Sequence, residues 1–435
     1  MRIESVAVLG AGTMGSGIAA LCAEVGCRVK LLDVSRAAAE QAITRMVEGR
    51  PPLLDDPARA GLITPGSFDD DLPAAVGAAD WVCEAIVEDL ATKRALFGRI
   101  EPLRREGSVV SSNTSGILLR TITEGLPERL RRDIAVTHFF NPVRVMKLVE
   151  LVPGADTRAE VIRTLDDFLS DRLGKGVVHA KDTVNFIGNR IGCFWMLSGL
   201  HKAHAGLADG LSMEQIDALL AAPFGIPPTG LYGLLDLVGL DVLELVAKNL
   251  AANLPDGDAG LAFARLPPIE HAMVLRGQLG RKTGGGFYRL LRHDDGTRSR
   301  EVFDLRLQSW RAAENVVLAP EHGEAASLLF HDSPEGRFAW AVMGGTLSYA
   351  AELIPEIADD VVNVDRAMRW GFNWQRGPFE LLDALGPARI IDRLEAADQP
   401  LPRMLEVLRQ AGAERFYADG GRTYLDAGGA FRPVP

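Results

Sequence analysis

The sequence predicts an α/β domain with a doubly wound parallel sheet, followed by a duplicated all-α domain. In roughly the first 180 residues, short β-rich apolar runs alternate with segments whose apolar residues recur at helical spacing. That alternation is typical of a parallel sheet covered by helices. Beyond Phe186 the strand pattern gives way to helical segments, and one stretch of them recurs later in the chain.

Six apolar runs are expected to be strands of the sheet. The segments between them indicate helices, notably residues 90–105. The proline- and aspartate-rich residues 50–71 are expected to form a loop or a short helical excursion. The expected strands are residues 5–9, 29–32, 79–84, 108–112, 134–139 and 147–152.

Composition is that of a water-soluble protein with sizeable cores, at 47% hydrophobic and 24% charged residues. The net charge of −11, without a long Lys/Arg cluster, argues against nucleic acid or an anionic membrane as a partner. No apolar run approaches the roughly 18 residues of a membrane span, and the first strand begins too early for a signal peptide. Four cysteines without a CxxC pair indicate core residues in a reducing compartment and no metal site. We therefore expect a cytoplasmic protein.

The first expected strand leads directly into a glycine-rich turn, Gly-Ala-Gly-Thr-Met-Gly at 10–15, which opens a helix. Gly10 permits the tight turn, Gly12 lets the backbone approach a pyrophosphate, and Gly15 allows close packing of helix on strand. The unpaired N–H groups and the dipole at the helix N-terminus suit a phosphate. A glycine turn can also be purely structural, but strand, turn, helix and strand in this order predict a Rossmann-type dinucleotide-binding domain.

An acidic residue, Asp33, ends the second expected strand. Its carboxylate would accept a hydrogen bond from a ribose 2′-hydroxyl and repel a 2′-phosphate, so NAD is favoured over NADP. Arg36 stands close by and leaves that preference open.

Polar residues follow several of the expected strands. Ligands of such sheets bind beyond the carboxyl ends of the strands, which places Glu84, Glu88, the run Ser-Ser-Asn-Thr-Ser at 111–115 and His138 along one crevice. His138 and Glu150 on the next strand can act as a general base and its orienting partner. The alternative for His138 is a core histidine that is hydrogen-bonded to the backbone. The alternative for the run at 111–115 is a polar loop or a helix cap.

Several motifs, taken together, resemble the L-3-hydroxyacyl-CoA dehydrogenase family of fatty-acid β-oxidation. They occur in the family's order over the first 290 residues, which is far more specific than the glycine turn alone. The motifs are GAGTMG at 10–15, EAIVEDL at 84–90 with Lys93, SNTS at 112–115, HFFNPV at 138–143, MKLVE at 146–150, KDTVNFIGNR at 181–190 and GRKTGGGFY at 280–288.

The resemblance implies oxidation of L-3-hydroxyacyl-CoA to 3-ketoacyl-CoA, with hydride passing to NAD⁺. His138 would be the general base, and Glu150 would orient and charge it. Ser115 would bind the 3-oxygen of the substrate near the nicotinamide, and Asn189 would contact the substrate from the second domain. The family's cofactor contacts match Gly10, Ala11, Gly12, Thr13, Met14, Gly15, Asp33, Glu88, Lys93, Ser115, Asn141 and Lys282.

The oxidation of an alcohol requires these residue types, independently of the resemblance. Oxidation of a secondary alcohol needs a base near neutrality for the hydroxyl proton, and imidazole suits both directions of the transfer. A buried carboxylate on the other ring nitrogen would fix the tautomer and stabilise the imidazolium.

One family feature is missing from this chain. Family members carry a serine and a lysine for CoA after the second strand, whereas residues 45–52 read RMVEGRPP and have no lysine at the matching place. Arg45 or Arg50 could substitute, although solvated surface arginines are the commoner case. The CoA contacts and the acyl chain length therefore stay open.

The helical half contains an internal repeat. The segment IDALL at 216–220 with LLD at 234–236 resembles VDRAM at 364–368 with LLD at 381–383. Gly336 then aligns with Asn189, so the second copy has lost the amide that the chemistry would use. In small family members this domain forms a homodimer, which suggests an internal pseudo-dimer here, with one catalytic site per chain. The expected divisions are residues 1–183 (NAD-binding), 184–290 (first helical copy), 291–330 (linker, most polar at 292–300), 331–420 (second, degenerate copy) and 421–435 (tail).

Partners and rival functions follow from the same resemblance. The glycine- and proline-rich tail after Asp419 resembles the junction at which larger relatives join an enoyl-CoA hydratase domain. Candidate partners besides the acyl-CoA substrate are a second copy of the chain, a hydratase and a thiolase. One rival function is a dehydrogenase of a small free 3-hydroxy acid or sugar acid. The other is a silent NAD-binding scaffold, against which the presence of every expected catalytic residue argues.

Overall fold

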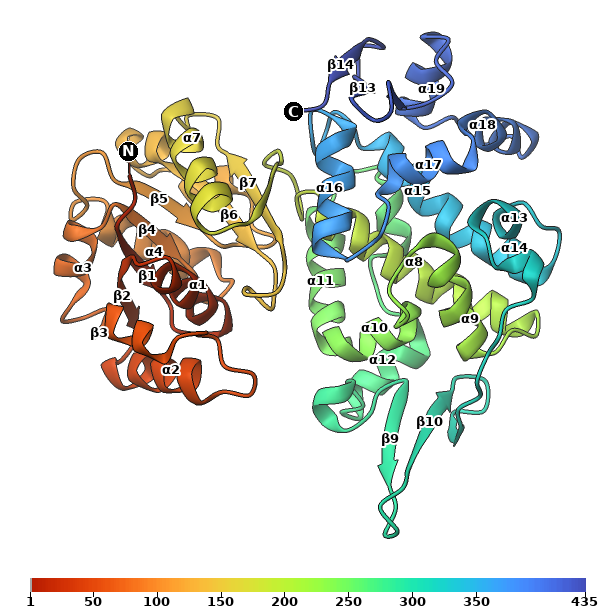
Figure 1. Ribbon diagram of the computed structural model, residues 1–435, viewed down its shortest axis with the longest axis horizontal. Coiled ribbons are helices and arrows are strands. Elements are labelled where there is room, and N and C mark those ends of the chain that lie inside the picture. The colour runs from red at the N-terminus through yellow and green to blue at the C-terminus, as the bar shows by residue number, and fades with distance from the viewer. Residues whose placement is uncertain (1) are drawn as a thin grey trace. The chain divides into compact units, whose positions relative to one another are not determined.

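The computed structural model describes residues 2–435, which form two compact units. The first unit ends at Ile187 and the second begins at Gly188. In Figure 1 the first unit runs from red to yellow and the second from green to blue.

The first unit is an eight-stranded sheet flanked by helices, with strand order β3-β2-β1-β4-β5-β6-β7-β8. All neighbouring pairs from β3 to β6 are parallel, which confirms the predicted Rossmann-type doubly wound domain. The strands are β1 (Ser5–Leu9), β2 (Arg28–Asp33), β3 (Ile63–Ser67), β4 (Trp81–Glu84), β5 (Val109–Ser112), β6 (Ile134–Phe139), β7 (Leu148–Pro153) and β8 (Gly176–His179). The helices are α1 (Thr13–Glu24), α2 (Arg36–Glu48), the 3₁₀ helix η1 (Pro57–Leu62), α3 (Leu72–Ala78), α4 (Leu90–Ile100), α5 (Leu119–Thr123), α6 (Glu128–Asp133), α7 (Ala159–Asp167) and the π-helical turn η2 (Phe168–Arg172).

Three features of this sheet differ from the expectation. Residues 63–67 form the edge strand β3, inside the stretch expected to be a loop. Their Pro65 and Gly66 weaken the strand pattern, and an edge strand tolerates proline. β7 runs antiparallel to β6, because the connection at 140–147 is too short for the crossover that two parallel strands would need. The four-residue β8, which was not expected, extends the sheet beyond β7.

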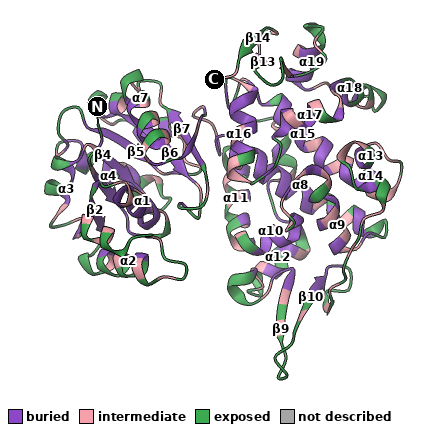
Figure 2. Cartoon of the chain, viewed as in Figure 1, coloured by how far each residue is buried: buried purple, intermediate pink, exposed green. Residues whose placement is uncertain are grey.

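The second unit is mainly helical and centres on α8 (Gly188–Ala208), a 21-residue helix that is buried over most of its length. Figure 2 shows this burial. The remaining α-helices are α9 (Met213–Leu219), α10 (Gly230–Val238), α11 (Leu240–Asn253), α12 (Pro268–Leu275), α13 (Ala325–Leu329), α14 (Pro334–Ala339), α15 (Gly345–Glu352), α16 (Val361–Gly371), α17 (Pro378–Leu385), α18 (Pro387–Ala396) and α19 (Arg403–Gln410). Short helical turns are η3 (Ala222–Phe224), η4 (Ala259–Phe263), η5 (Arg281–Thr283), η6 (Pro320–His322) and η7 (Trp340–Gly344).

Two small sheets occupy segments that were expected to be irregular. Residues 292–300, expected to be a linker, belong to a hairpin of β9 (Tyr288–Arg292) and β10 (Arg298–Asp304), which β11 (Ser309–Ala312) extends. The tail contributes β13 (Thr423–Leu425) and β14 (Phe431–Pro433), which pair in order behind β12 (Tyr417–Ala418). Charged side chains hid the strand pattern of β9, β10 and β11, and the strands of the second sheet have only two or three residues each.

Candidate active site

The glycine turn connects β1 to α1 with the geometry that a dinucleotide needs. Gly10 has a φ of +110°, and a Cβ there would lie 2.4 Å from the carbonyl oxygen of Ala85. At Gly12 a Cβ would meet nothing within 4 Å, so the backbone is open to a ligand. Ala11 and Gly15 are buried, Met14 is half-buried, and Thr13 is exposed in the first turn of α1. The turn therefore has a shape that suits a pyrophosphate, and the contacts of the individual residues at 10–15 with a cofactor stay a prediction.

The acid at the end of β2 lies against this turn. One oxygen of Asp33 accepts from the amide of Ala11 at 2.6 Å, and the other accepts from the amide of Val34 at 2.7 Å. Arg36, the residue that left NADP open, is paired with Asp71 at 2.9 Å and donates to the Pro65 carbonyl. Because that guanidinium is engaged with a carboxylate, the arrangement favours an unphosphorylated ribose.

A buried ion cluster lies beyond β4. The ammonium of Lys93, 1% exposed, lies 2.7 Å from Glu84 and 3.2 Å from Glu88. Glu84 is completely buried and also accepts from the Ser112 hydroxyl at 2.5 Å and the Ile86 amide at 2.8 Å. The sequence placed Glu84 in the crevice without a role. It is the acceptor that joins β4, β5 and α4, and its signal was its position directly after an apolar strand.

Glu88 holds the loop that carries Ser115. Its carboxylate accepts from the Thr114 hydroxyl at 2.6 Å, the Ser115 amide at 2.9 Å and the Gly116 amide at 3.1 Å. Burial would raise the pKa of Glu88, but the Lys93 ammonium and these donors outweigh it and lower the pKa below its ordinary value. The Ser115 hydroxyl is exposed, 3.5 Å from the same carboxylate. Lys93 therefore acts on this loop through Glu88, and a direct contact with the cofactor stays a prediction.

His138 and Glu150 face each other across the antiparallel strands β6 and β7. Nδ1 of His138 lies 2.6 Å from Glu150 Oε2, and both side chains are buried. The other Glu150 oxygen accepts from the Ile187 amide at 2.9 Å. An ionised Glu150 makes Nδ1 the protonated nitrogen and leaves Nε2 as the acceptor. The pair has the arrangement of a general base with its orienting carboxylate.

The loop after His138 is held by a buried lysine. Lys175 donates from Nζ to the carbonyls of Val143 and, at 2.8 Å, Met146. Burial lowers the pKa of Lys175 to about 8. Asn141, a predicted cofactor contact, is exposed in this loop. Lys175 was not predicted from the sequence, because its partners are backbone carbonyls and leave no side-chain motif.

Two predicted residues belong to the second unit. Asn189, half-buried, is the second residue of α8, and its predicted contact with the substrate stays a prediction. Its neighbour Arg190, 1% exposed, donates to the Tyr349 hydroxyl at 2.6 Å and to Asp258 at 2.5 Å. Lys282 is exposed and paired with Asp241 at 2.6 Å, and its predicted cofactor contact is likewise untested.

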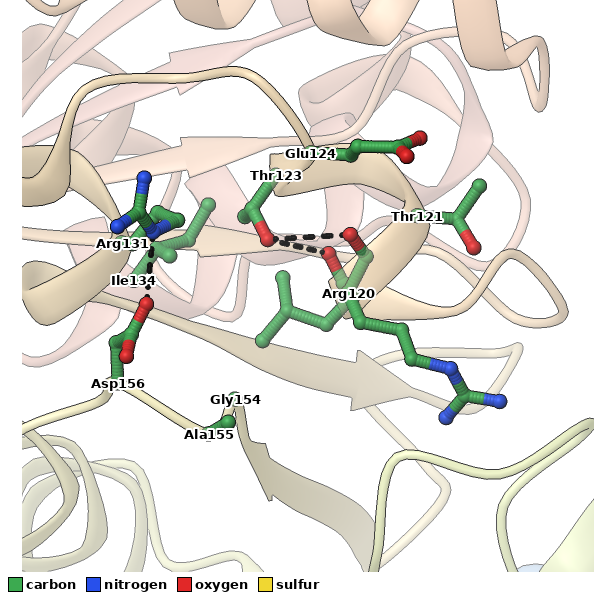
Figure 3. Close-up of a pocket in the computed structure, with 10 residues that line it drawn as sticks. Arg120, Thr121, Thr123, Glu124, Arg131, Ile134, Gly154, Ala155 and Asp156 are labelled. Carbon is green, nitrogen blue, oxygen red and sulfur yellow. Dashed lines mark hydrogen bonds and ion pairs between the residues drawn. The ribbon is translucent and has the colours of Figure 1, made fainter.

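A separate pocket of about 410 Å³ in the first unit is drawn in Figure 3. Its arginines are committed within the protein, since Arg131 pairs with Asp156 at 2.7 Å and Arg120 lies 3.6 Å from Asp182. The pocket reaches Ile134, at the start of β6, whereas His138 lies near the end of that strand. It is therefore not part of the candidate site.

Among residues 2–435 no group of three or more His, Cys, Asp or Glu side chains is arranged to hold a metal. No helix in this part of the chain is long and apolar enough to cross a bilayer. The four cysteines are free and buried, and burial raises the pKa of each thiol.

Family comparison agrees with this geometry. Residues 5–183 match the 3-hydroxyacyl-CoA dehydrogenase NAD binding domain, and residues 186–290 match the 3-hydroxyacyl-CoA dehydrogenase C-terminal domain. The chain belongs to the 3-hydroxyacyl-CoA dehydrogenase family. The glycine turn and Asp33 therefore lie in an NAD-binding domain of this family.

Individual proteins that are similar to this chain have names that refer to the same family or to fatty acid oxidation. A Bacillus subtilis (strain 168) protein named as a 3-hydroxyacyl-CoA dehydrogenase is 34% identical over 100% of this chain and 57% of its own length. A Rickettsia felis protein named as a fatty acid oxidation complex trifunctional enzyme is 34% identical over 93% of this chain and 56% of its own length. The crystal structure of 3-hydroxybutyryl-CoA dehydrogenase from Escherichia coli K12 superposes with a TM-score of 0.71 at 25% identity, covering 94% of this chain and 98% of that one. The chain spans a little over half the length of the two sequence relatives.

Proposed function

We propose that this chain oxidises L-3-hydroxyacyl-CoA thioesters to 3-ketoacyl-CoA, with NAD⁺ as the hydride acceptor. The observation that carries the proposal is the buried His138–Glu150 pair, in which His138 lies near the end of β6. The same sheet contains β1, which leads into the glycine turn. A base and a dinucleotide turn on one sheet are the two parts that alcohol oxidation requires.

His138 supplies the base. Nε2 takes the proton of the 3-hydroxyl as the C3–H bond breaks and its hydride leaves. Glu150 stabilises the resulting imidazolium, because its carboxylate lies 2.6 Å from Nδ1. In the reverse direction, the same nitrogen returns the proton to the carbonyl oxygen of the 3-ketoacyl group.

Donors around the 3-oxygen complete the proposed site. The Ser115 hydroxyl would donate to the oxygen on which negative charge develops, and Asn189 would add an amide donor. Glu88 fixes the backbone amide of Ser115 and so sets where the hydroxyl points. Bound NAD would supply the hydride-accepting ring. The residues proposed to hold it are the glycine turn, Asp33, Glu88, Lys93, Ser115, Asn141 and Lys282.

The second unit supports a proposal that its helical domain is duplicated. Asp217 accepts from the Tyr232 amide and the Tyr288 hydroxyl. Asp365 repeats this with the Phe379 amide and the Tyr417 hydroxyl.

A second pair of aspartates repeats in the same way. Asp236 accepts from the amides of Phe287 and Tyr288, and Asp383 accepts from those of Phe416 and Tyr417. In each repeat the tyrosine begins a strand, β9 at Tyr288 and β12 at Tyr417. The proposed second copy therefore extends to β12 and its partner strand β13.

The second copy has no room for the amide that Asn189 would supply in the first. A Cβ at Gly336 would lie 2.1 Å from the His331 carbonyl oxygen, so no side chain fits there. Arg190 of the first copy reaches Tyr349 of the second, so the copies pack on each other within the unit. One catalytic site per chain follows from the proposal. Association with a hydratase, a thiolase or a second chain stays a prediction, for which the Rickettsia felis relative's name gives the context.

A steady-state scan tests the proposed activity. Purified protein is mixed with 3-ketoacyl-CoA thioesters from four carbons upward, with NADH or NADPH, and absorbance at the reduced nicotinamide band is followed. We expect turnover with at least one chain length and a preference for NADH of about tenfold or more, because Asp33 would repel a 2′-phosphate. Absence of turnover at every chain length would support the silent scaffold instead.

A further inference from the structure

The hairpin β9–β10 carries an unbalanced cluster of arginines on one face. Alternate residues of a strand point to opposite sides, and Arg292 lies opposite Arg298 while Leu290 lies opposite Arg300. Arg292, Arg298 and Arg300 therefore share one face, which we call the arginine face. All three are exposed, in a protein whose net charge is −11.

The register brings two of these charges to their closest approach. The Phe303 amide donates to the Phe287 carbonyl at 2.7 Å, and the His293 amide donates to the Thr297 carbonyl at 3.0 Å. Hydrogen-bonded pairs alternate along an antiparallel ladder, so Arg292 and Arg298 form a pair of the other kind, with Cα atoms about 4.5 Å apart. Like charges in such a pair repel each other.

Arg300 interacts electrostatically with the buried carboxylates of Asp217 and Asp236, whereas Arg292 and Arg298 have no carboxylate within ion-pair distance in residues 2–435. Within residues 2–435 none of the three arginines forms an ion pair, and Arg300 instead lies 3.8 Å from the centroid of the Tyr288 ring. The nearest acid along β10, Glu301, is on the opposite face and pairs with Arg289 at 2.6 Å. Asp295 in the turn accepts from the amide and hydroxyl of Thr297. The arginine face therefore has the charge to hold an external anion.

A cavity adjoins the arginine face at the base of the hairpin. Its volume is about 670 Å³, and its lining includes Arg281, Arg300, Thr229, Tyr288 and Leu290. One carboxylate, that of Asp236, also lines it and accepts from the amides of Phe287 and Tyr288. Arg281 also has no ion-pair partner in the described chain, and Leu290 is 54% exposed. The size is that of a small-molecule site, and the lining offers guanidinium and hydroxyl donors beside an apolar surface.

The repeated hairpin of the second copy shows that the fold does not require this face. β12 and β13 have two and three residues, against five and seven for β9 and β10. Both hairpins start from a tyrosine that bonds to an aspartate of α9 or α16. The extension that distinguishes β9–β10 is the part that carries Arg292 and Arg298.

We propose that the arginine face and its adjoining cavity bind a small ligand carrying two or more phosphate groups. Guanidinium groups bind phosphate oxygens through paired N–H donors, and a chain of phosphates can span charges that neighbouring strands place within about 10 Å. The cavity volume of about 670 Å³ suits a small molecule better than an extended acidic peptide. The proposal rests on residues of the second unit alone and does not depend on the proposed activity.

Calorimetric titration of the full chain with inorganic tripolyphosphate, in saturating NAD⁺ and low salt, tests the site. We expect one ligand per chain, and binding at least tenfold weaker in Arg292→Gln/Arg298→Gln. The matched control is Arg163→Gln/Arg409→Gln, which removes two exposed arginines of α7 and α19 and should bind as the wild type does. Addition of 0.5 M NaCl should weaken binding by screening.

Competition then separates the sources of the phosphates. Displacement of tripolyphosphate by free CoA supports a coenzyme thioester, and displacement by ATP alone supports a nucleotide. The proposal is overturned by equal affinity in the wild type and Arg292→Gln/Arg298→Gln, by displacement with neither ligand, or by a hexaglutamate peptide that binds the arginine face as tightly as tripolyphosphate.

Discussion

Replacement of His138 by alanine is expected to lower kcat with a 3-ketoacyl-CoA substrate by about 10²–10⁴-fold, since proton transfer by a positioned side chain contributes that much. The affinity for NADH, measured by fluorescence titration, should change little, because His138 bonds to Glu150 and not to the glycine turn. His179→Ala is the matched control, since His179 pairs with Asp166 on the exposed side of the first unit. Near-normal turnover by His138→Ala would remove this residue from the mechanism.

Glu150→Gln gives a sharper test of the same pair. The Ile187 amide donates to one Glu150 oxygen, so the glutamine oxygen should take that place and turn its NH₂ towards Nδ1 of His138. The imidazole would then carry its proton on Nε2, where the substrate's proton must go. We expect a loss of kcat approaching that of His138→Ala. Full activity in Glu150→Gln would show that the carboxylate does not set the tautomer.

Lys93→Met is expected to lower the free energy of unfolding by about 3–5 kcal/mol, because it leaves the fully buried Glu84 without its cation. Urea denaturation followed by circular dichroism measures the change. In Lys93→Met/Glu84→Gln both charges are absent, and most of the lost stability should return. Lys248→Met is the control, since Lys248 is 66% exposed and pairs with Glu244 on the surface, where such pairs contribute about 0.3–0.5 kcal/mol. A Lys93→Met variant as stable as the wild type would contradict the proposed role of the cluster.

The parts that could be predicted from the sequence are those whose residue types have one main use. Residues 5–9 and 134–139 form β1 and β6 as expected, because continuous apolar runs of that length suit a strand buried on both faces. The glycine turn was predicted with its helix, since a φ of +110° at Gly10 and the close approach to Ala85 need glycine. The His138–Glu150 contact was predicted from two residues on consecutive strands, although the antiparallel direction of β7, which places them opposite each other, was not.

The rest depended on tertiary contacts that leave no local pattern. β3 lies on the sheet edge with Pro65 in its middle, and β8 has only four residues. Lys175 bonds to carbonyl groups of a loop about thirty residues earlier in the chain, so no side-chain motif marks it. The β9–β10 hairpin appeared as a linker because Arg292, Arg298 and Arg300 occupy its exposed face.

A direct comparison of acetoacetyl-CoA with free acetoacetate as NADH-dependent substrates tests the central claim. The account predicts that kcat/KM for the thioester exceeds that for the free acid by at least about a hundredfold, since binding energy from the CoA portion stabilises the transition state. Equal values, or turnover of the free acid alone, would contradict it and would identify the protein as a dehydrogenase of small hydroxy acids.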